Sequence, residues 1–117
     1  MKKHYISVAM CTYNGEKYVA EQLKSILNQN HPVDEIVIGD DGSTDRTVEI
    51  IEEILKTSKV KYKIIQNETN LGYRKNFENV IANTKGDIIF LSDQDDVWLE
   101  EKVKTLINDL EQDEQYM

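Results

Sequence analysis

Two patterns of apolar and polar residues take turns along this chain, one typical of strands and one typical of helices. Short apolar runs at residues 5–11, 35–39 and 87–92 have the length of strands, and residues 60–66 alternate between apolar and polar as a strand does. Elsewhere apolar residues recur every three or four positions, which predicts amphipathic helices. The helical stripes are Val19, Leu23, Ile26 and Leu27; Val48, Ile51 and Leu55; Phe77, Val80 and Ile81; and Val103, Leu106, Ile107 and Leu110.

The order strand–helix, repeated four times, predicts an α/β fold with three layers, α/β/α, and a mainly parallel sheet. The length of 117 residues indicates one domain with one core. We expect the strand at 87–92 to be buried on both faces because it is almost wholly apolar. We also expect Ser43 or Thr44 to cap the second helix.

Composition narrows the class of protein. A net charge of −8 argues against a nucleic-acid partner and against a polybasic membrane anchor. No apolar stretch approaches the ~20 residues that span a bilayer, so we expect a cytoplasmic chain, with membrane association of a full-length protein left open. The single cysteine, Cys11, lies in an apolar run and is expected to be a buried structural thiol.

Three polar clusters follow three of the predicted strands. They are Thr12-Tyr13-Asn14, Asp40-Asp41 and Asp93-Gln94-Asp95-Asp96. Ligands of open parallel sheets bind beyond the carboxyl ends of the strands. The clusters are therefore expected to line one crevice.

The last cluster holds three carboxylates in four residues. Like charges this close repel each other unless a cation lies among them. Oxygen-only ligands favour Mg²⁺ or Mn²⁺, and either ion could bridge to a diphosphate. A solvated acidic loop that caps the last helix explains the same residues equally well.

The other two clusters also allow two interpretations. Asp41 could accept a hydrogen bond from a base NH, or could belong to a turn with a helix cap, which its segment alone favours. The ring of Tyr13 could stack on a base, or could pack at the end of a strand.

At these clusters the sequence resembles the family 2 glycosyltransferases. The matching segments are residues 8–14, 36–45, 70–72 and 86–96, in the family's order and spacing, and the resemblance covers nearly the whole chain. The version Ser92-Asp93-Gln94-Asp95-Asp96-Val97-Trp98 looks most like bacterial members that transfer rhamnose and related sugars in polysaccharide assembly.

The resemblance implies a GT-A fold that binds a nucleoside diphosphate sugar, UDP- or dTDP-linked. It implies nucleotide contacts from Thr12, Tyr13, Asn14, Asp41, Lys75 and Asp93. Within the family's DxD motif, Asp95 would be the principal ligand of Mn²⁺ or Mg²⁺, helped by Asp93.

The implied reaction is sugar transfer with inversion to a saccharide or lipid-linked saccharide acceptor. In relatives the general base and the acceptor site lie downstream of the DxD motif. We therefore expect the base beyond residue 117, and residues 1–117 to form a nucleotide-sugar-binding domain that lacks the acceptor half. Such a chain would bind donor but transfer no sugar alone.

Two other classes compete with this interpretation. Asp93-Gln94-Asp95-Asp96-Val97 also fits the nucleophile motif of haloacid-dehalogenase-like phosphatases, with Asp93 as the nucleophile. A receiver-like or docking α/β module, without catalysis, suits the length and element order. The receiver class, however, needs an acidic pair after the first strand, where this chain has Cys11-Thr12-Tyr13.

Overall fold

A computed structural model describes residues 4–93 and 96–115 of the chain. The strands are β1 (Ile6–Thr12), β2 (Glu35–Asp40), β3 (Lys61–Gln66) and β4 (Ile88–Ser92). The helices are α1 (Val19–Leu27), α2 (Thr47–Leu55), α3 (Tyr73–Ala82) and α4 (Lys102–Gln115). The predicted alternation of strands and helices is confirmed.

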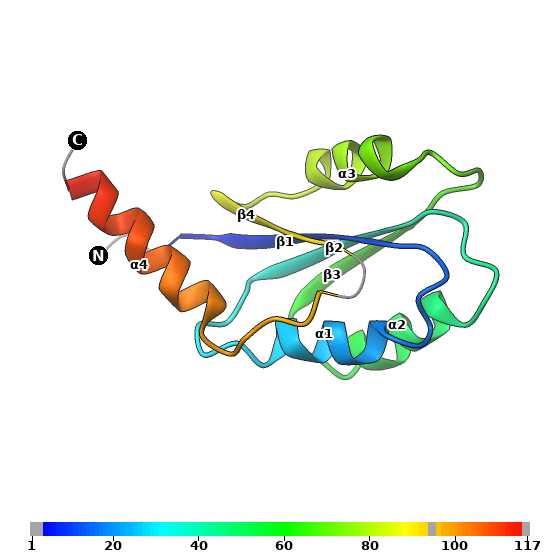
Figure 1. The fold of residues 1–117 in the computed structure, drawn as a ribbon, viewed down its shortest axis with the longest axis horizontal. Helices are drawn as coiled ribbons and strands as arrows, with labels where there is room; N and C mark the ends of the chain where they lie inside the picture. The colour runs from blue at the N-terminus through cyan, green and yellow to red at the C-terminus, as the bar shows by residue number, and fades with distance from the viewer. Residues whose placement is uncertain (1–3, 94–95, 116–117) are drawn as a thin grey trace.

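The strands form one parallel sheet in the order β3-β2-β1-β4, with β1 at its centre. Figure 1 shows α1 and α2 on one face of the sheet and α3 on the other. This arrangement confirms the three-layer α/β/α architecture. Within the described residues, no helix has the length and apolar character needed to cross a bilayer.

The two faces of β1 build two separate apolar clusters. Ile6, Val8 and Met10 point into the larger cluster, which α1, α2 and the start of α4 share. Ala9 and Cys11 point into a smaller cluster beneath α3. Because successive side chains of a strand point to opposite faces, one strand supports both layers of helices.

Gly39 lets α3 lie close to the sheet. A Cβ atom at this position would overlap the amide oxygen of Asn76 and a methyl group of Val80. The Asn76 side-chain amide instead donates to the Gly39 carbonyl at 3.0 Å. The absence of a side chain on β2 thus allows a direct polar contact between helix and strand.

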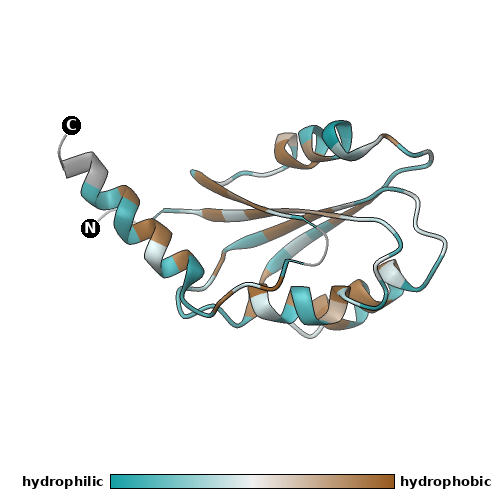
Figure 2. Cartoon of the chain, viewed as in Figure 1, coloured by the Kyte–Doolittle hydropathy of each residue, from teal (hydrophilic) through white to brown (hydrophobic). Residues whose placement is uncertain are grey.

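The expectation that the strand at 87–92 is buried on both faces is wrong. Ile89 and Leu91 are 38% and 52% exposed, and Figure 2 shows the apolar colour running along β4. The physical reason is position: β4 is an edge strand, and α3 packs on β1 and β2.

Two further expectations need correction. Neither Ser43 nor Thr44 caps the second helix, because α2 begins at Thr47, whose amide and hydroxyl both donate to Asp45. In the last helix, Leu106 and Leu110 are exposed although Val103 and Ile107 are buried. Figure 1 shows the reason, since α4 extends past the end of the sheet and does not lie across it.

We expect Gly39→Ala to lower the free energy of unfolding by about 1–3 kcal/mol, because the added methyl group forces α3 away from β2. Urea unfolding followed by circular dichroism measures this change. Glu78→Ala, on the exposed side of α3, is the control. Equal stability of the two variants would show that Gly39 is not needed for the approach of α3.

Candidate functional site

The carboxyl ends of β1, β2 and β4 meet at one edge of the sheet, as the sequence predicts. In the parallel register Thr12 pairs with Asp40, and Met10 pairs with Ser92. The residues that follow these strands therefore leave the sheet side by side. They include Tyr13, Asp41 and Asp93.

The loops after β1 and β2 are tied together by short hydrogen bonds. The Thr12 hydroxyl donates to Asp40 at 2.7 Å, and the Thr12 carbonyl accepts from the Asp41 amide at 2.9 Å. The Asn14 amide donates to the Ser43 hydroxyl oxygen, and the Asn14 side-chain oxygen accepts from the Thr44 amide, both at 2.8 Å. These contacts give Ser43 and Thr44 a bridging role in place of the expected helix cap.

Tyr13 and Asn14 are exposed in the loop after β1. Asn14 has a φ of 48°, a left-handed conformation that Asn tolerates better than most residues. Tyr13 keeps 46% of its surface exposed at the edge of the sheet. Both residues are thus accessible, but the Asn14 side chain is engaged by the Thr44 amide, and Thr12 is buried at the end of β1.

Asp41 is a buried carboxylate, only 6% exposed, that accepts hydrogen bonds from four residues. It accepts from the Leu71 amide at 2.7 Å, the Gly72 amide at 3.1 Å and the Asn67 side chain at 2.9 Å, with the Asn70 side chain at 3.5 Å. Burial raises the pKa of Asp41, but these hydrogen bonds together bring the pKa below its usual value. Asp41 thus anchors the loop that leads into α3, a role the sequence interpretation did not include.

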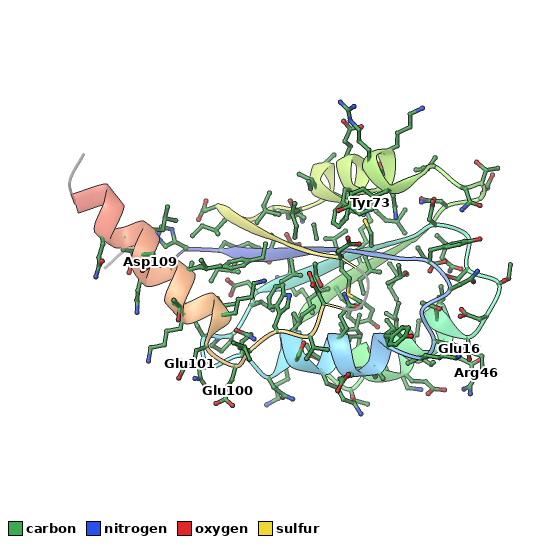
Figure 3. All side chains as sticks on the ribbon, in the orientation of Figure 1. Glu16, Arg46, Tyr73, Glu100, Glu101 and Asp109 are labelled. Carbon is green, nitrogen blue, oxygen red and sulfur yellow. The ribbon has the colours of Figure 1, made fainter. Side chains whose placement is uncertain are left out.

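Asp93 lies between the end of β1 and the start of α3. Burial first, and then the charges of Asp93 and Asp41, raise the pKa of Cys11 to about 12. The charge of Asp93, followed by burial and a side-chain hydrogen bond with Asp93, raises the pKa of Tyr73. Figure 3 shows Tyr73 beneath α3, on the side that faces the sheet. Asp41 and Asp93 therefore both lie near the Cys11 thiol, on the face of the sheet that α3 covers.

The acidic cluster is described only in part. Asp95, the expected principal metal ligand, and Gln94 lie outside the described residues. Asp93 and Asp96 are described and exposed, and the Asp93 amide lies 3.4 Å from an Asp96 carboxylate oxygen. No group of three or more metal-ligating side chains occurs among the described residues. The oxygen donors at this strand end fit a hard divalent cation by their chemistry.

Lys75 lies in the first turn of α3 and is exposed. The buried residues of that helix are Asn76, Phe77 and Val80, which pack toward the sheet. Lys75 therefore belongs to the solvent-facing part of the helix, near the end that carries Tyr73.

Gln22 contributes to the site without having been predicted. This α1 residue donates through its side-chain amide to the Ser92 hydroxyl at 2.9 Å and to the Asp93 carbonyl at 2.5 Å. The signal in the sequence is an amide three residues after Val19 and directly before Leu23, within the apolar stripe of the helix. A polar residue at such a position is expected to be buried and hydrogen-bonded.

A parallel α/β sheet whose polar loops converge at its carboxyl edge defines a class of domain that binds its ligands beyond the ends of its strands. Within that class, the chain belongs to the family described as Glycosyl transferase family 2, which matches residues 7–117. The predicted family and the GT-A fold are thereby confirmed.

Two relatives illustrate the similarity. The dTDP-rhamnosyl transferase RfbG of Shigella flexneri is 40% identical over 103 residues, which are 85% of this chain and 36% of RfbG. The crystal structure of S. aureus TarS 1–349 superposes with a TM-score of 0.82 and 32% identity over 92% of this chain and 32% of TarS. TarS 1–349 is also solved with UDP and with UDP-GlcNAc.

A more distant structure supports the fold. The mannosyltransferase PcManGT of Pyrobaculum calidifontis, solved with GDP-Man and Mn²⁺, gives a TM-score of 0.80 at 20% identity, over 87% of this chain and 31% of PcManGT. The chain spans about a third of the length of these relatives.

Asp41→Asn should lower the free energy of unfolding by about 1–3 kcal/mol at neutral pH, because an amide cannot accept from all the donors around it. The folded-state pKa of Asp41 is lowered, so its contribution is complete above the unfolded value near pH ~4 and is lost as pH falls through the folded value. The stability gap between wild type and variant should therefore narrow in acid. Urea unfolding across this pH range tests it, with Asp109→Asn on α4 as the control.

We expect the Cys11 thiol to resist modification in the folded protein. With a pKa of about 12 and 6% exposure, it should react with a disulfide reagent at mildly alkaline pH about a thousandfold slower than an exposed thiol. Lys59→Cys in a Cys11→Ala background supplies that reference thiol. Comparable rates would contradict the burial of Cys11, and unfolding in urea should make them equal.

Proposed function

We propose that this chain is the donor-binding part of a glycosyltransferase that takes its sugar from a UDP- or dTDP-linked donor. The observation that carries the proposal is the meeting of Tyr13, Asp41 and Asp93 at the carboxyl edge of β1, β2 and β4. The named ligands of TarS and the named donor of RfbG support a pyrimidine nucleotide.

The exposed ring of Tyr13 is suited to stacking on the base. Asp41 holds the neighbouring loop through the Leu71 and Gly72 amides. The same carboxylate would accept a hydrogen bond from an NH group of the base. Thr12 and Asn14 keep the loop of Tyr13 in place, and Lys75 would approach the nucleotide from the first turn of α3.

The acidic cluster would hold Mn²⁺ or Mg²⁺, with Asp95 as the principal ligand and Asp93 beside it. The ion would stabilise the charge that develops on the departing diphosphate. The Mn²⁺ present with PcManGT and the oxygen donors of Asp93 and Asp96 support this part of the proposal.

The reaction we propose is transfer with inversion to a saccharide or lipid-linked saccharide acceptor in the synthesis of a bacterial polysaccharide or surface glycan. Inversion needs a base that deprotonates the acceptor hydroxyl. We place this base and the acceptor site outside these 117 residues, so the chain by itself would bind donor without transferring sugar.

The position of the acidic cluster argues against the phosphatase alternative. In such a phosphatase the strand that carries the nucleophile comes first in the domain. Asp93 instead follows β4, which is the fourth strand along the chain and lies at the edge of the sheet. A receiver-like site would need acidic residues at the end of β1, where the strand ends in the buried Cys11 and Thr12 and is followed by Tyr13 and Asn14.

Calorimetric titration with UDP and dTDP, in Mn²⁺ and in EDTA, tests the proposal. We expect binding in Mn²⁺ that weakens by more than about tenfold in EDTA, because the ion joins the diphosphate to the carboxylates. Asp95→Asn should produce the same loss in Mn²⁺. Asp109→Asn removes the same charge from α4, far from Tyr73 in Figure 3, and should bind as wild type does.

Failure of the folded wild-type chain to bind either nucleotide would contradict the proposal. Equal losses in Asp95→Asn and Asp109→Asn would show that net charge, and not the acidic cluster, controls binding. The preferred nucleotide would decide between uridine and thymidine donors.

A further inference from the structure

A row of polar side chains on α1 holds the chain that follows β4. Gln22 and Ser25 are three residues apart and lie on one side of α1, and Gln29, just beyond the end of the helix, donates to the Ser25 carbonyl at 3.1 Å. Each of them hydrogen-bonds to backbone more than 60 residues later in the sequence. The contacts of the row reach Asp93, Trp98 and Val103.

Gln22 makes the first of these contacts and is the most buried of the three, at 1% exposure. Its side-chain nitrogen carries two hydrogens, which match its two acceptors, the Ser92 hydroxyl and the Asp93 carbonyl. Ser92 itself is fully buried. Water therefore cannot easily replace Gln22, and the amide fixes where the chain leaves β4.

Ser25 and Gln29 continue the contact beyond the acidic cluster. The Ser25 hydroxyl oxygen accepts from the Trp98 amide at 2.9 Å. Gln29 donates to the Leu99 carbonyl at 2.7 Å and accepts from the Val103 amide at 2.9 Å. These two residues position the approach to α4, several residues away from Asp93.

The N-terminal end of α1 is joined to the loop after β1 and to the start of α2. The Gly15 carbonyl accepts from the Val19 amide at 2.9 Å, and the Gly15 amide donates to Thr47 at 2.8 Å, next to the loop that carries Tyr13. One helix thus links the loop of Tyr13 to the carbonyl of Asp93.

We propose that Gln22 is a positioning residue for the donor site: by holding the Asp93 carbonyl, it directs the Asp93 carboxylate toward the metal–diphosphate. This inference rests on the proposed function. Gln22 would affect the metal-dependent part of nucleotide binding and leave the part that Tyr13 provides.

The test compares Gln22→Met with Gln29→Met, each made in the 117-residue chain. Met has nearly the volume of Gln but no amide, and both positions are buried, so the two variants lose comparable structural hydrogen bonds. Nucleotide affinity is measured in Mn²⁺ and in EDTA. Hydrogen exchange of a peptide that covers residues 90–98 is measured without metal, and unfolding in urea gives the stability.

We expect Gln22→Met to weaken Mn²⁺-dependent nucleotide binding by about 10–100-fold, the usual effect of losing a group that orients a metal ligand. Affinity in EDTA should stay the same, and exchange in residues 90–98 should accelerate. Gln29→Met should lower stability to a similar degree while retaining the affinity in Mn²⁺.

Three results would overturn the inference. Unchanged Mn²⁺-dependent binding in Gln22→Met, with wild type binding normally, would leave Gln22 as a core residue only. Equal losses in both variants, or equal losses in Mn²⁺ and EDTA, would indicate general destabilisation. Absence of nucleotide binding in wild type would instead overturn the proposed function, and this inference with it.

Discussion

The buried carboxylate of Asp41 is the contact on which the α3 side of this structure depends. Its hydrogen bonds to the Leu71 and Gly72 amides fix the residues that lead into α3. Its partner Asn67 also donates to Asn76, which in turn donates to the Gly39 carbonyl. This chain of polar contacts joins the end of β2 to the first turn of α3. The helix is thereby held over Cys11, where Tyr73 meets Asp93.

Asp93, which follows β4, is contacted from both faces of the sheet. On one face α1 uses Gln22 to hold the Asp93 carbonyl, while on the other face α3 presents Tyr73 to the Asp93 side chain. Backbone and side chain of one residue are thus fixed from two layers. Such a double constraint suits the role of metal ligand that we propose for Asp93, because a ligand's orientation must be set before an ion and a nucleotide bind.

The sequence predicted the elements and the layers well because both follow from local apolar spacing, as in Val19, Leu23 and Ile26 of α1. The prediction of burial failed where burial depends on the position of a strand in the sheet. Ile89 and Leu91 read as core residues, but β4 is an edge strand whose α3 face the helix does not cover. The sequence interpretation also missed contacts between distant residues. Nothing in the sequence near Asp41 shows that its hydrogen-bond donors come about 30 residues later. The strand order predicts that the polar loops meet at one edge of the sheet, but it does not show which residues hold these loops in place.

The acidity of the site is the remaining physical difficulty for the proposed function, since a diphosphate would have to approach Asp41 and Asp93 on a chain of net charge −8. The structure answers it differently for the two carboxylates. Asp41 is met by amide dipoles from Leu71, Gly72 and Asn67, which lower its pKa and compensate its charge within the fold. Asp93 is exposed, and its carboxylate interacts with Tyr73 of α3. A divalent ion at this strand end would turn the repulsion into attraction. The same residues would then select a nucleotide that brings both a base for the Tyr13 side and a diphosphate for the metal.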